Sequence, residues 1–333
     1  MRYGLPYQGS KNRLAKRIVD LLPSADNLYD VFAGGCAISH CALLSGKYKC
    51  VHFSDINGSV VLFKDCLEGN IPDGSEWISR EEFERRKDTD PYVRILWSFG
   101  NNQKSYLYSQ DIEPYKKAVH EMIYAPTPNE RRLKFREVCR LMPLVKPSNP
   151  TYNLEHSERI ENTPPYLSTY NTQSHSNVHG KYSGGQTGYN LTMRAYRTSE
   201  LGGAERLQHQ VRAEAFSQIP FLNGEYRMQV CDYRDVQILP NSVIYCDIPY
   251  LNTGTYRNMK FDFDAFYQWA LQQEQLVFIS EYYMPDDFVC IAEFKRTSSF
   301  SATNNSKKEI EKVFIPKHQF EQYKSLNRTS LFD

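Results

Sequence analysis

The stretch NLYDVFAGGCAISHCALLSGKYKCVHFSDI, residues 27–56, decides the fold. Its first nine residues predict a buried strand that breaks at two glycines, and residues 36–47 then predict a helix. Residues 50–56 predict a second strand, and a second helix is expected at 59–70. Because helices and strands alternate here, the stretch is typical of a parallel, doubly wound α/β sheet.

The same alternation extends toward both ends of the chain. Residues 10–23 predict a helix in which Ser10 is the N-cap and Leu14, Ile18 and Leu21 share one face. Strand signals return late in the sequence, at residues 226–233, 242–250, 275–282, 290–300 and 311–316. We therefore expect one catalytic domain built from residues 1–75 and 225–333.

Between these parts the alternation is lost. Residues 76–103 and 129–143 have helical and basic character, residues 171–192 are polar and glycine-rich, and residues 200–219 again predict a helix. The predicted fold class is therefore α/β, a Rossmann-like doubly wound sheet with an inserted, mainly helical domain at 76–224.

Composition excludes several classes of protein. The formal net charge of the 333 residues is +1, so any binding to a polyanion needs a local basic surface. The eight cysteines have no zinc-ligand spacing, so no metal is expected. No apolar run has the ~20 residues of a membrane span. We expect a cytoplasmic monomer with reduced thiols and no membrane contact.

Two strand ends carry candidate ligand contacts. Gly34 and Gly35 would let a ligand approach the backbone where the first strand ends, although an ordinary strand–helix turn explains them equally well. Asp55 ends the second strand, where an acid can accept hydrogen bonds from ribose hydroxyls; its alternative role is a helix N-cap. The spacing is not that of a pyrophosphate-binding loop.

Two later strand ends also present acids. Asp232 in VCDYRDV could accept from the exocyclic amine of a purine, or be a surface turn residue. Asp247 follows the β-favouring residues 243–246 and precedes Ile248, Pro249 and Tyr250 in the stretch VIYCDIPYLNTGTY, residues 243–256. An acid, a proline and an aromatic ring at a strand end are typical of a ligand site.

These motifs together resemble a known family. DIPY resembles the D-P-P-Y motif of amino-group DNA methyltransferases, which use S-adenosyl-L-methionine. PYQGSK (6–11) resembles their N-terminal motif, DVFAGG their cofactor glycine loop, SDIN their ribose-binding motif and CDYRDV their adenine-binding motif. The order of motifs is similar to the α group, D12 class, of Dam-type adenine-N6 methyltransferases, in which the insert recognises the DNA target.

The resemblance implies roles for single residues. It implies that the catalytic segment is Asp247, Ile248, Pro249 and Tyr250, with an extruded adenine held by the carboxylate, the Ile248 carbonyl and the tyrosine ring. Ile248 stands where most of the family has proline, which bears on the rigidity of the turn. The residues implied for the cofactor are Tyr7, Lys11, Asp30, Phe32, Gly34, Gly35, Asp55, Asp232 and Tyr233.

Contacts to double-stranded DNA are expected from the insert. Arg132, Arg194 and Arg197 are candidates for the phosphates, among other basic residues, and solvated surface is their alternative. The candidates for base readout on polar loops are Asn101, Asn102, Lys104, Lys181 and Tyr182, for which turn chemistry is the alternative.

The predicted function is site-specific methylation of adenine N6 in double-stranded DNA by base flipping. Alternatives are a cytosine-N4 or RNA base methyltransferase, and a DNA-binding relative without catalysis. Both a restriction-linked enzyme with a cognate endonuclease and a solitary, phage-borne enzyme fit the sequence.

Overall fold

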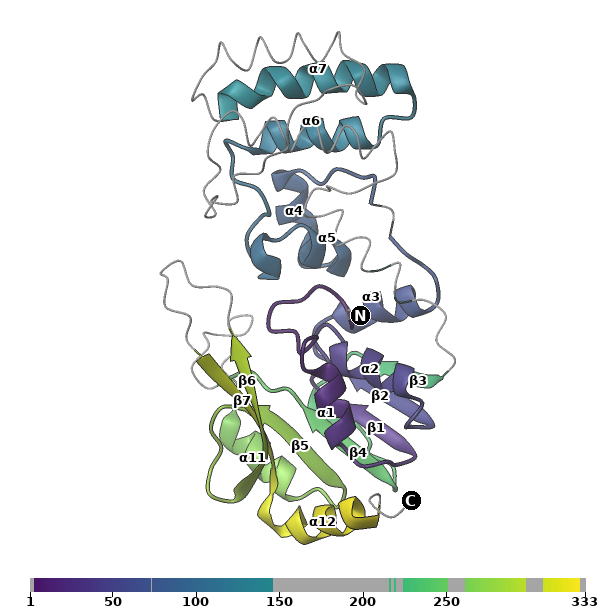
Figure 1. The fold of residues 1–333 in the computed structure, drawn as a ribbon, viewed down its shortest axis with the longest axis vertical. Helices are drawn as coiled ribbons and strands as arrows, with labels where there is room; N and C mark the ends of the chain where they lie inside the picture. Colours follow the sequence, from purple (N-terminus) through teal and green to yellow (C-terminus); the bar gives the residue numbers. More distant parts are fainter. Residues whose placement is uncertain are drawn as a thin grey trace. The chain divides into compact units, whose positions relative to one another are not determined.

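A computed structural model describes residues 3–72, 74–145, 216, 219, 224–250, 261–297 and 308–329 (Figure 1). Its contacts divide the chain into two units, one formed by Met1–Ile71 and Ala215–Asp333 and the other by Pro72–Glu214. The polar, glycine-rich stretch at 171–192 lies outside the described residues, as does nearly all of the helix expected at 200–219.

The first unit contains a mixed sheet of seven strands in the order β3-β2-β1-β4-β5-β7-β6 (Figure 1). Neighbours among β1 to β5 pair in parallel, and β7 runs antiparallel to both β5 and β6. This α/β sheet confirms the predicted class and is consistent with a methyltransferase fold. The strands are β1 (Asn27–Asp30), β2 (Cys50–Ser54), β3 (Glu225–Gln229), β4 (Ser242–Cys246), β5 (Leu276–Glu281), β6 (Phe288–Thr297) and β7 (Lys308–Pro316).

Helices pack on one face of this sheet through side chains that share a register. Asp30 of β1 lies beside Phe53 of β2 and Tyr245 of β4, so their side chains point to the same face. On that face Asp30 contacts α2 (Ala37–Ser45), and the Phe53 ring lies 5.4 Å from a ring of α3 (Ser59–Leu67). The C-terminal helix α12 (Phe320–Thr329) covers the same face, because its Tyr323 contacts the Tyr245 neighbour Phe278.

The opposite face is covered by α11 (Phe263–Leu271). Phe266 and Ala270 of this helix are fully buried in one cluster with Tyr29 of β1 and Ile244 of β4, whose side chains point away from Asp30. The sheet therefore has helices on both faces, as a doubly wound sheet requires.

The predicted helix at 10–23 is shorter than expected, and its expected cap is wrong. Helix α1 is Ala15–Leu21, its N-cap is Leu14, and Leu22 is buried in place of Leu21. The Ser10 hydroxyl instead accepts a hydrogen bond from the Asn12 backbone N–H at 3.3 Å. Residues 11–14 form a turn before the helix, closed by the Leu14 N–H, which donates to the Lys11 carbonyl at 2.8 Å.

The second unit is helical where it is described. Its helices are α4 (Arg80–Arg86), α5 (Pro91–Leu96), α6 (Glu113–Ile123) and α7 (Pro128–Val145), with a short 3₁₀ helix at Phe99–Asn101. Only 80–86 and 91–96 of the helical stretch predicted at 76–103 are α-helical, since Asp90 and Pro91 begin a new helix. No helix within the described part of the chain is both long and apolar enough to cross a membrane.

Candidate active site

The acids identified in the sequence lie at the topological switch point of the sheet, where the strand order reverses. The strand β1 lies between β2 on one side and β4 on the other, and ligands of open α/β sheets bind at the carboxyl ends of strands at such a point. Asp30 ends β1, Asp55 follows β2 and Asp247 follows β4. The Val31 N–H donates to the Tyr245 carbonyl at 3.2 Å, so β1 and β4 stay paired until their loops begin.

Asp55 holds the glycine turn that follows β1. The Gly34 N–H donates to one oxygen of the Asp55 carboxylate at 2.8 Å, and the Asn57 N–H donates to the other at 2.7 Å. The Ser59 hydroxyl donates to the Gly34 carbonyl at 2.6 Å. The structure thus brings Gly34 and Asp55 together, and Gly58 rather than Asp55 is the N-cap of α3. The ribose contact of Asp55 remains a prediction.

Tyr7 packs so closely on Gly34 and Gly35 that side chains at these positions would collide with it. A Cβ on Gly35 would lie 2.6 Å from the Tyr7 Cβ, and one on Gly34 would lie 3.2 Å from the Tyr7 ring. The Leu5 N–H donates to the Gly35 carbonyl at 2.7 Å, and the Asn57 amide donates to the Tyr7 hydroxyl at 3.1 Å. The N-terminal segment 3–12 therefore packs directly on the turn.

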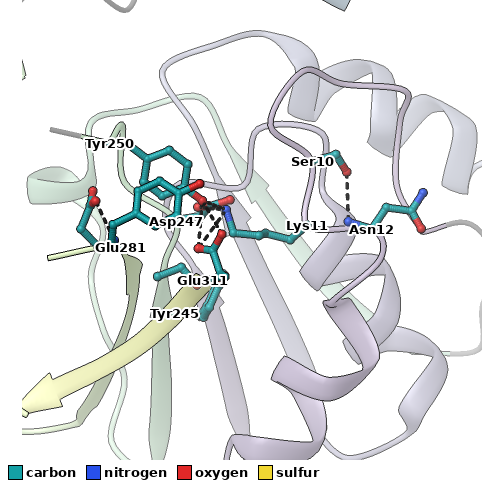
Figure 2. Close-up of polar contacts among 10 residues, drawn as sticks. Ser10, Lys11, Asn12, Tyr245, Asp247, Tyr250, Glu281 and Glu311 are labelled. Carbon is teal, nitrogen blue, oxygen red and sulfur yellow. Dashed lines mark hydrogen bonds and ion pairs between the residues drawn. The ribbon is translucent and has the colours of Figure 1, made fainter. Parts of the chain in front are cut away.

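That segment carries Lys11 into a buried polar cluster (Figure 2). The Lys11 ammonium lies 2.6 Å from an Asp247 carboxylate oxygen, 2.5 Å from the Tyr250 hydroxyl and 3.6 Å from a Glu311 oxygen. Lys11 is 3% exposed and Glu311 is completely buried, whereas the Asp247 side chain is 22% exposed. Of the two carboxylates paired with Lys11, Asp247 is thus the one that an incoming group can reach.

The Tyr250 hydroxyl is fixed between a donor and an acceptor. It donates to Glu311, whose two carboxylate oxygens are both 2.9 Å away, while it accepts from Lys11. Burial raises the pKa of Tyr250, and the charges of Asp247 and Glu311 raise it further, so the hydroxyl remains a donor at neutral pH. Its ring lies 4.6 Å from the Tyr282 ring at an interplanar angle of 34°.

Asp30 is a buried acid with a perturbed pKa. It accepts from the hydroxyl and the backbone N–H of Ser39 at 2.5 and 3.2 Å. Burial raises the pKa of Asp30 to about 7, and the negative charges of Asp247 and Asp55 contribute to the rise. Three carboxylates at this edge therefore repel one another, and a cationic ligand would relieve that repulsion. A ligand with a sulfonium and an ammonium group fits this set of negatively charged acceptors.

Two predicted cofactor residues lie in an aromatic cluster. The Phe32 ring is 5.1 Å from the Tyr233 ring and 5.6 Å from the Phe266 ring. Tyr233 is 6% exposed and belongs to the core, whereas Phe32 is half-buried. The structure brings Phe32 and Tyr233 together beside the glycine turn, and both also have an evident packing role.

Asp232 has the contacts of a surface turn residue. The Arg234 guanidinium donates to its two carboxylate oxygens at 2.7 and 3.1 Å, and these bonds lower the pKa of Asp232. Its carboxylate also accepts from the Arg234 backbone N–H at 3.0 Å and caps a short 3₁₀ helix. Recognition of a purine amine by Asp232 remains a prediction.

The predicted DNA-reading residues are described only in part. Asn101, with a φ of 60°, ends the short 3₁₀ helix, and Asn102 follows it. The Asn102 side-chain oxygen accepts from the backbone N–H groups of Lys104 and Ser105 at 2.9 and 3.0 Å. Asn102 therefore has at least a turn role. The Arg132 side chain is outside what the structure describes, as are Lys181, Tyr182, Arg194 and Arg197 entirely.

Sequence reasoning missed Glu311. It lies on β7 at an inward position that alternates with the buried residues Val313 and Ile315, while Ile310 is exposed. The sequence does not show this position as inward, because Val313, Phe314 and Ile315 form a continuous apolar run and the apolar Ile310 next to Glu311 is the exposed residue. Among the described residues, no group of three or more His, Cys, Asp or Glu side chains could hold a metal ion.

A comparison with protein families agrees with the motifs. Residues 7–139 match the family model described as D12 class N6 adenine-specific DNA methyltransferase. The match covers Tyr7, Lys11, the glycine turn and Asp55, and it confirms the resemblance found in the sequence. No curated protein matches the chain.

Proposed function

We propose that this protein transfers a methyl group from S-adenosyl-L-methionine to N6 of adenine in double-stranded DNA, at a specific short sequence. The family match supports adenine methylation, and the position of Asp247 carries the proposal. Asp247 follows β4, which pairs with β1; its carboxylate lies 2.6 Å from the Lys11 ammonium and remains partly exposed.

The chemistry follows from two hydrogen-bond acceptors. The amine of adenine is a weak nucleophile because its lone pair is delocalised into the ring. The Asp247 carboxylate and the Ile248 carbonyl would accept its two hydrogens and localise that pair on nitrogen. S-adenosyl-L-methionine supplies the electrophilic methyl group. No covalent intermediate with the protein is needed, because the site only has to position the amine nitrogen in line with the sulfonium methyl group. The amine becomes cationic when it takes the methyl group, and it then loses a proton.

Tyr250 would hold the base after it leaves the duplex. Extrusion of a base costs a few kcal/mol, and stacking on an aromatic ring returns ~1–3 kcal/mol. The Tyr250 ring suits this role because its hydroxyl is anchored by Lys11 and Glu311. An anchored ring loses little further conformational entropy when a base stacks on it.

The cofactor would occupy the edge formed by the ends of β1 and β2. Asp55 would accept from the ribose, Asp30 would face the ammonium group, and Phe32 with Tyr233 would border the adenine ring. The family resemblance implies that Lys11 pairs with the methionine carboxylate, whereas the contacts described for it are to Asp247, Tyr250 and Glu311. The proposal keeps all these residues in the site.

DNA would be bound by the second unit. The unit Pro72–Glu214 would contain the target-recognition domain, because its described helices carry clusters of basic residues. Some of these charges are already paired, since Lys134 lies 2.5 Å from a Glu121 oxygen. We further propose a cytoplasmic monomer; a restriction-linked and a solitary enzyme both fit.

The test uses purified protein, S-adenosyl-L-methionine and unmethylated duplex DNA, with nucleosides analysed by mass spectrometry. N6-methyladenine should form with the native protein and be lost in Asp247→Ala, whose circular dichroism should be unchanged. Methylated cytosine, or methylation of RNA alone, would support the alternatives. Sequencing of modified DNA from a methylase-free host would then give the sequence context.

A further inference from the structure

Glu311 is the completely buried member of the Lys11 cluster and lies outside every motif of the resemblance (Figure 2). It comes from β7, near the C-terminus, whereas Lys11 comes from the segment before α1. A buried carboxylate is costly unless it is paired and hydrogen-bonded. A second acid beside the Lys11 ammonium, which Asp247 already contacts, therefore needs a functional reason.

The hydrogen bonds in the cluster have a direction. Lys11 donates to Asp247 and to the Tyr250 hydroxyl, and that hydroxyl donates in turn to Glu311. Glu311 is thus the terminal acceptor and has no direct hydrogen bond to Lys11 among the described contacts, at 3.6 Å. Its charge still acts on Lys11, because attraction between ions at this distance is strong in a buried site.

We infer that Glu311 is a positioning residue for methyl transfer, which fixes the Tyr250 ring and serves as a second counter-ion for Lys11. This inference rests on the proposed function. With Glu311 in place, the Lys11 charge stays balanced while Asp247 accepts the amine hydrogens of the base. With its charge removed, Lys11 would be balanced by Asp247 alone, whose oxygens would then be poorer acceptors for the amine.

The charge of Glu311 also bears on the protonation of Asp247. A negative neighbour disfavours the ionised form of Asp247, and the positive Lys11 favours it. Removing the Glu311 charge leaves the Lys11 effect opposed by Asp30 alone among the described carboxylates, so Asp247 should lose its proton at a lower pH. The groups described as acting on Asp247 come from four parts of the fold: Lys11, Asp30 of β1, Tyr245 and Cys246 of β4, and Tyr250. Glu311 shares the partners Lys11 and Tyr250 with Asp247.

The test compares Glu311→Gln with the native protein in the methylation assay across pH. Glutamine keeps an oxygen acceptor for Tyr250 and removes the charge. We expect kcat to fall about tenfold while the Kd of S-adenosyl-L-methionine changes less than about twofold. The acid limb of the kcat profile should move down by about one pH unit. Glu293→Gln is the control, since Glu293 is a 55% exposed acid on the neighbouring strand β6.

The outcomes separate the inference from the proposed function. If the native protein forms no N6-methyladenine, the proposed function fails. If it does, and Glu311→Gln has the native kcat and the native acid limb, the role of Glu311 is refuted. A fall in kcat with an unmoved acid limb, or an equal fall in Glu293→Gln, also refutes it.

A second variant covers the case in which Glu311→Gln does not fold. Glu311→Asp keeps the charge but shortens the side chain, so it withdraws the acceptor from Tyr250. It should lower kcat and leave the acid limb within about 0.3 pH units of the native one. A native kcat in this variant would overturn the positioning of Tyr250, and a downward shift of the limb would overturn the charge argument.

Discussion

Gly4→Ala should disrupt the packing of the N-terminal segment on the glycine turn. A Cβ on Gly4 would lie 2.2 Å from the Gly35 carbonyl oxygen, 2.7 Å from the Ala37 nitrogen and 2.8 Å from the Cys36 carbonyl carbon. All three are backbone atoms, so no side-chain rotation can relieve the contacts. The left-handed φ of +68° adds strain for any residue other than glycine.

Gly9→Ala is the matched control, because Gly9 has a φ of +79° and no atom within 4 Å of its Cβ position. Both variants incur the left-handed penalty of ~1–2 kcal/mol. Only Gly4→Ala adds overpacking, which costs ~1–3 kcal/mol or more. We therefore expect its free energy of unfolding to fall by about 2 kcal/mol more than that of Gly9→Ala, measured by urea denaturation.

The segment has one way to avoid this cost, which is to leave the turn. It would then take Tyr7 away from Gly34 and Gly35, and Lys11 away from Asp247. In that case the loss of stability is smaller, and binding of S-adenosyl-L-methionine, measured by calorimetry, should weaken strongly. Equal stability of the two variants together with equal cofactor affinity would refute the reasoning, because the clash would then have no consequence.

Three further results are expected. Asp247→Asn should lower kcat by at least about a hundredfold with the fold retained, since an amide is a weaker acceptor and can present a donor to the amine; near-native kcat would exclude Asp247 as the acceptor. Asp55→Ala should weaken cofactor binding and loosen the turn, because the Gly34 and Asn57 N–H groups lose their acceptor; unchanged calorimetric affinity would remove the ribose assignment. The pKa of Asp30 is about 7 in the folded protein and 3.8 in the unfolded chain. The free energy of unfolding should therefore fall as the pH rises from 3.8 to about 7, by at most roughly 4 kcal/mol from this residue. Asp30→Asn should flatten the dependence of the free energy of unfolding on pH, measured by urea denaturation. Parallel profiles for the variant and the native protein would contradict the burial argument.

The sheet could be predicted because its signals are local. Each strand of residues 27–56 is a short apolar run, and the glycines and acids mark where each run ends. The helix α6 had a signal that was overlooked: Tyr115, Ala118, Val119 and Met122 are spaced as one buried helical face, and Pro114 stands in the first turn.

The errors come from contacts between distant parts of the chain. Ser10 is a good N-cap by its chemistry, but the N-terminal segment is held by the bond from Leu5 to Gly35, which local propensity does not contain. Glu311 was missed for the same reason, since its ammonium neighbour Lys11 lies at the other end of the sequence. The local pattern of β7 would bury Ile310 rather than Glu311, whereas the structure buries Glu311 and exposes Ile310.

The charges of the site decide what can approach it. Asp30, Asp55, Asp247 and Glu311 oppose the Lys11 ammonium, so the edge of the sheet is negative unless Asp30 is protonated. A phosphate would be repelled there, whereas a neutral base or a sulfonium cation would not. An extruded base must therefore enter alone, with its flanking phosphates held by basic side chains elsewhere on the protein. Glu311→Gln reduces this negative charge, so a rise in non-specific DNA affinity is expected only if phosphates come near the cluster. If the salt dependence of DNA binding is unchanged in that variant, the DNA phosphates lie far from the Lys11 cluster. The extruded base would then be the part of the DNA that contacts Asp247.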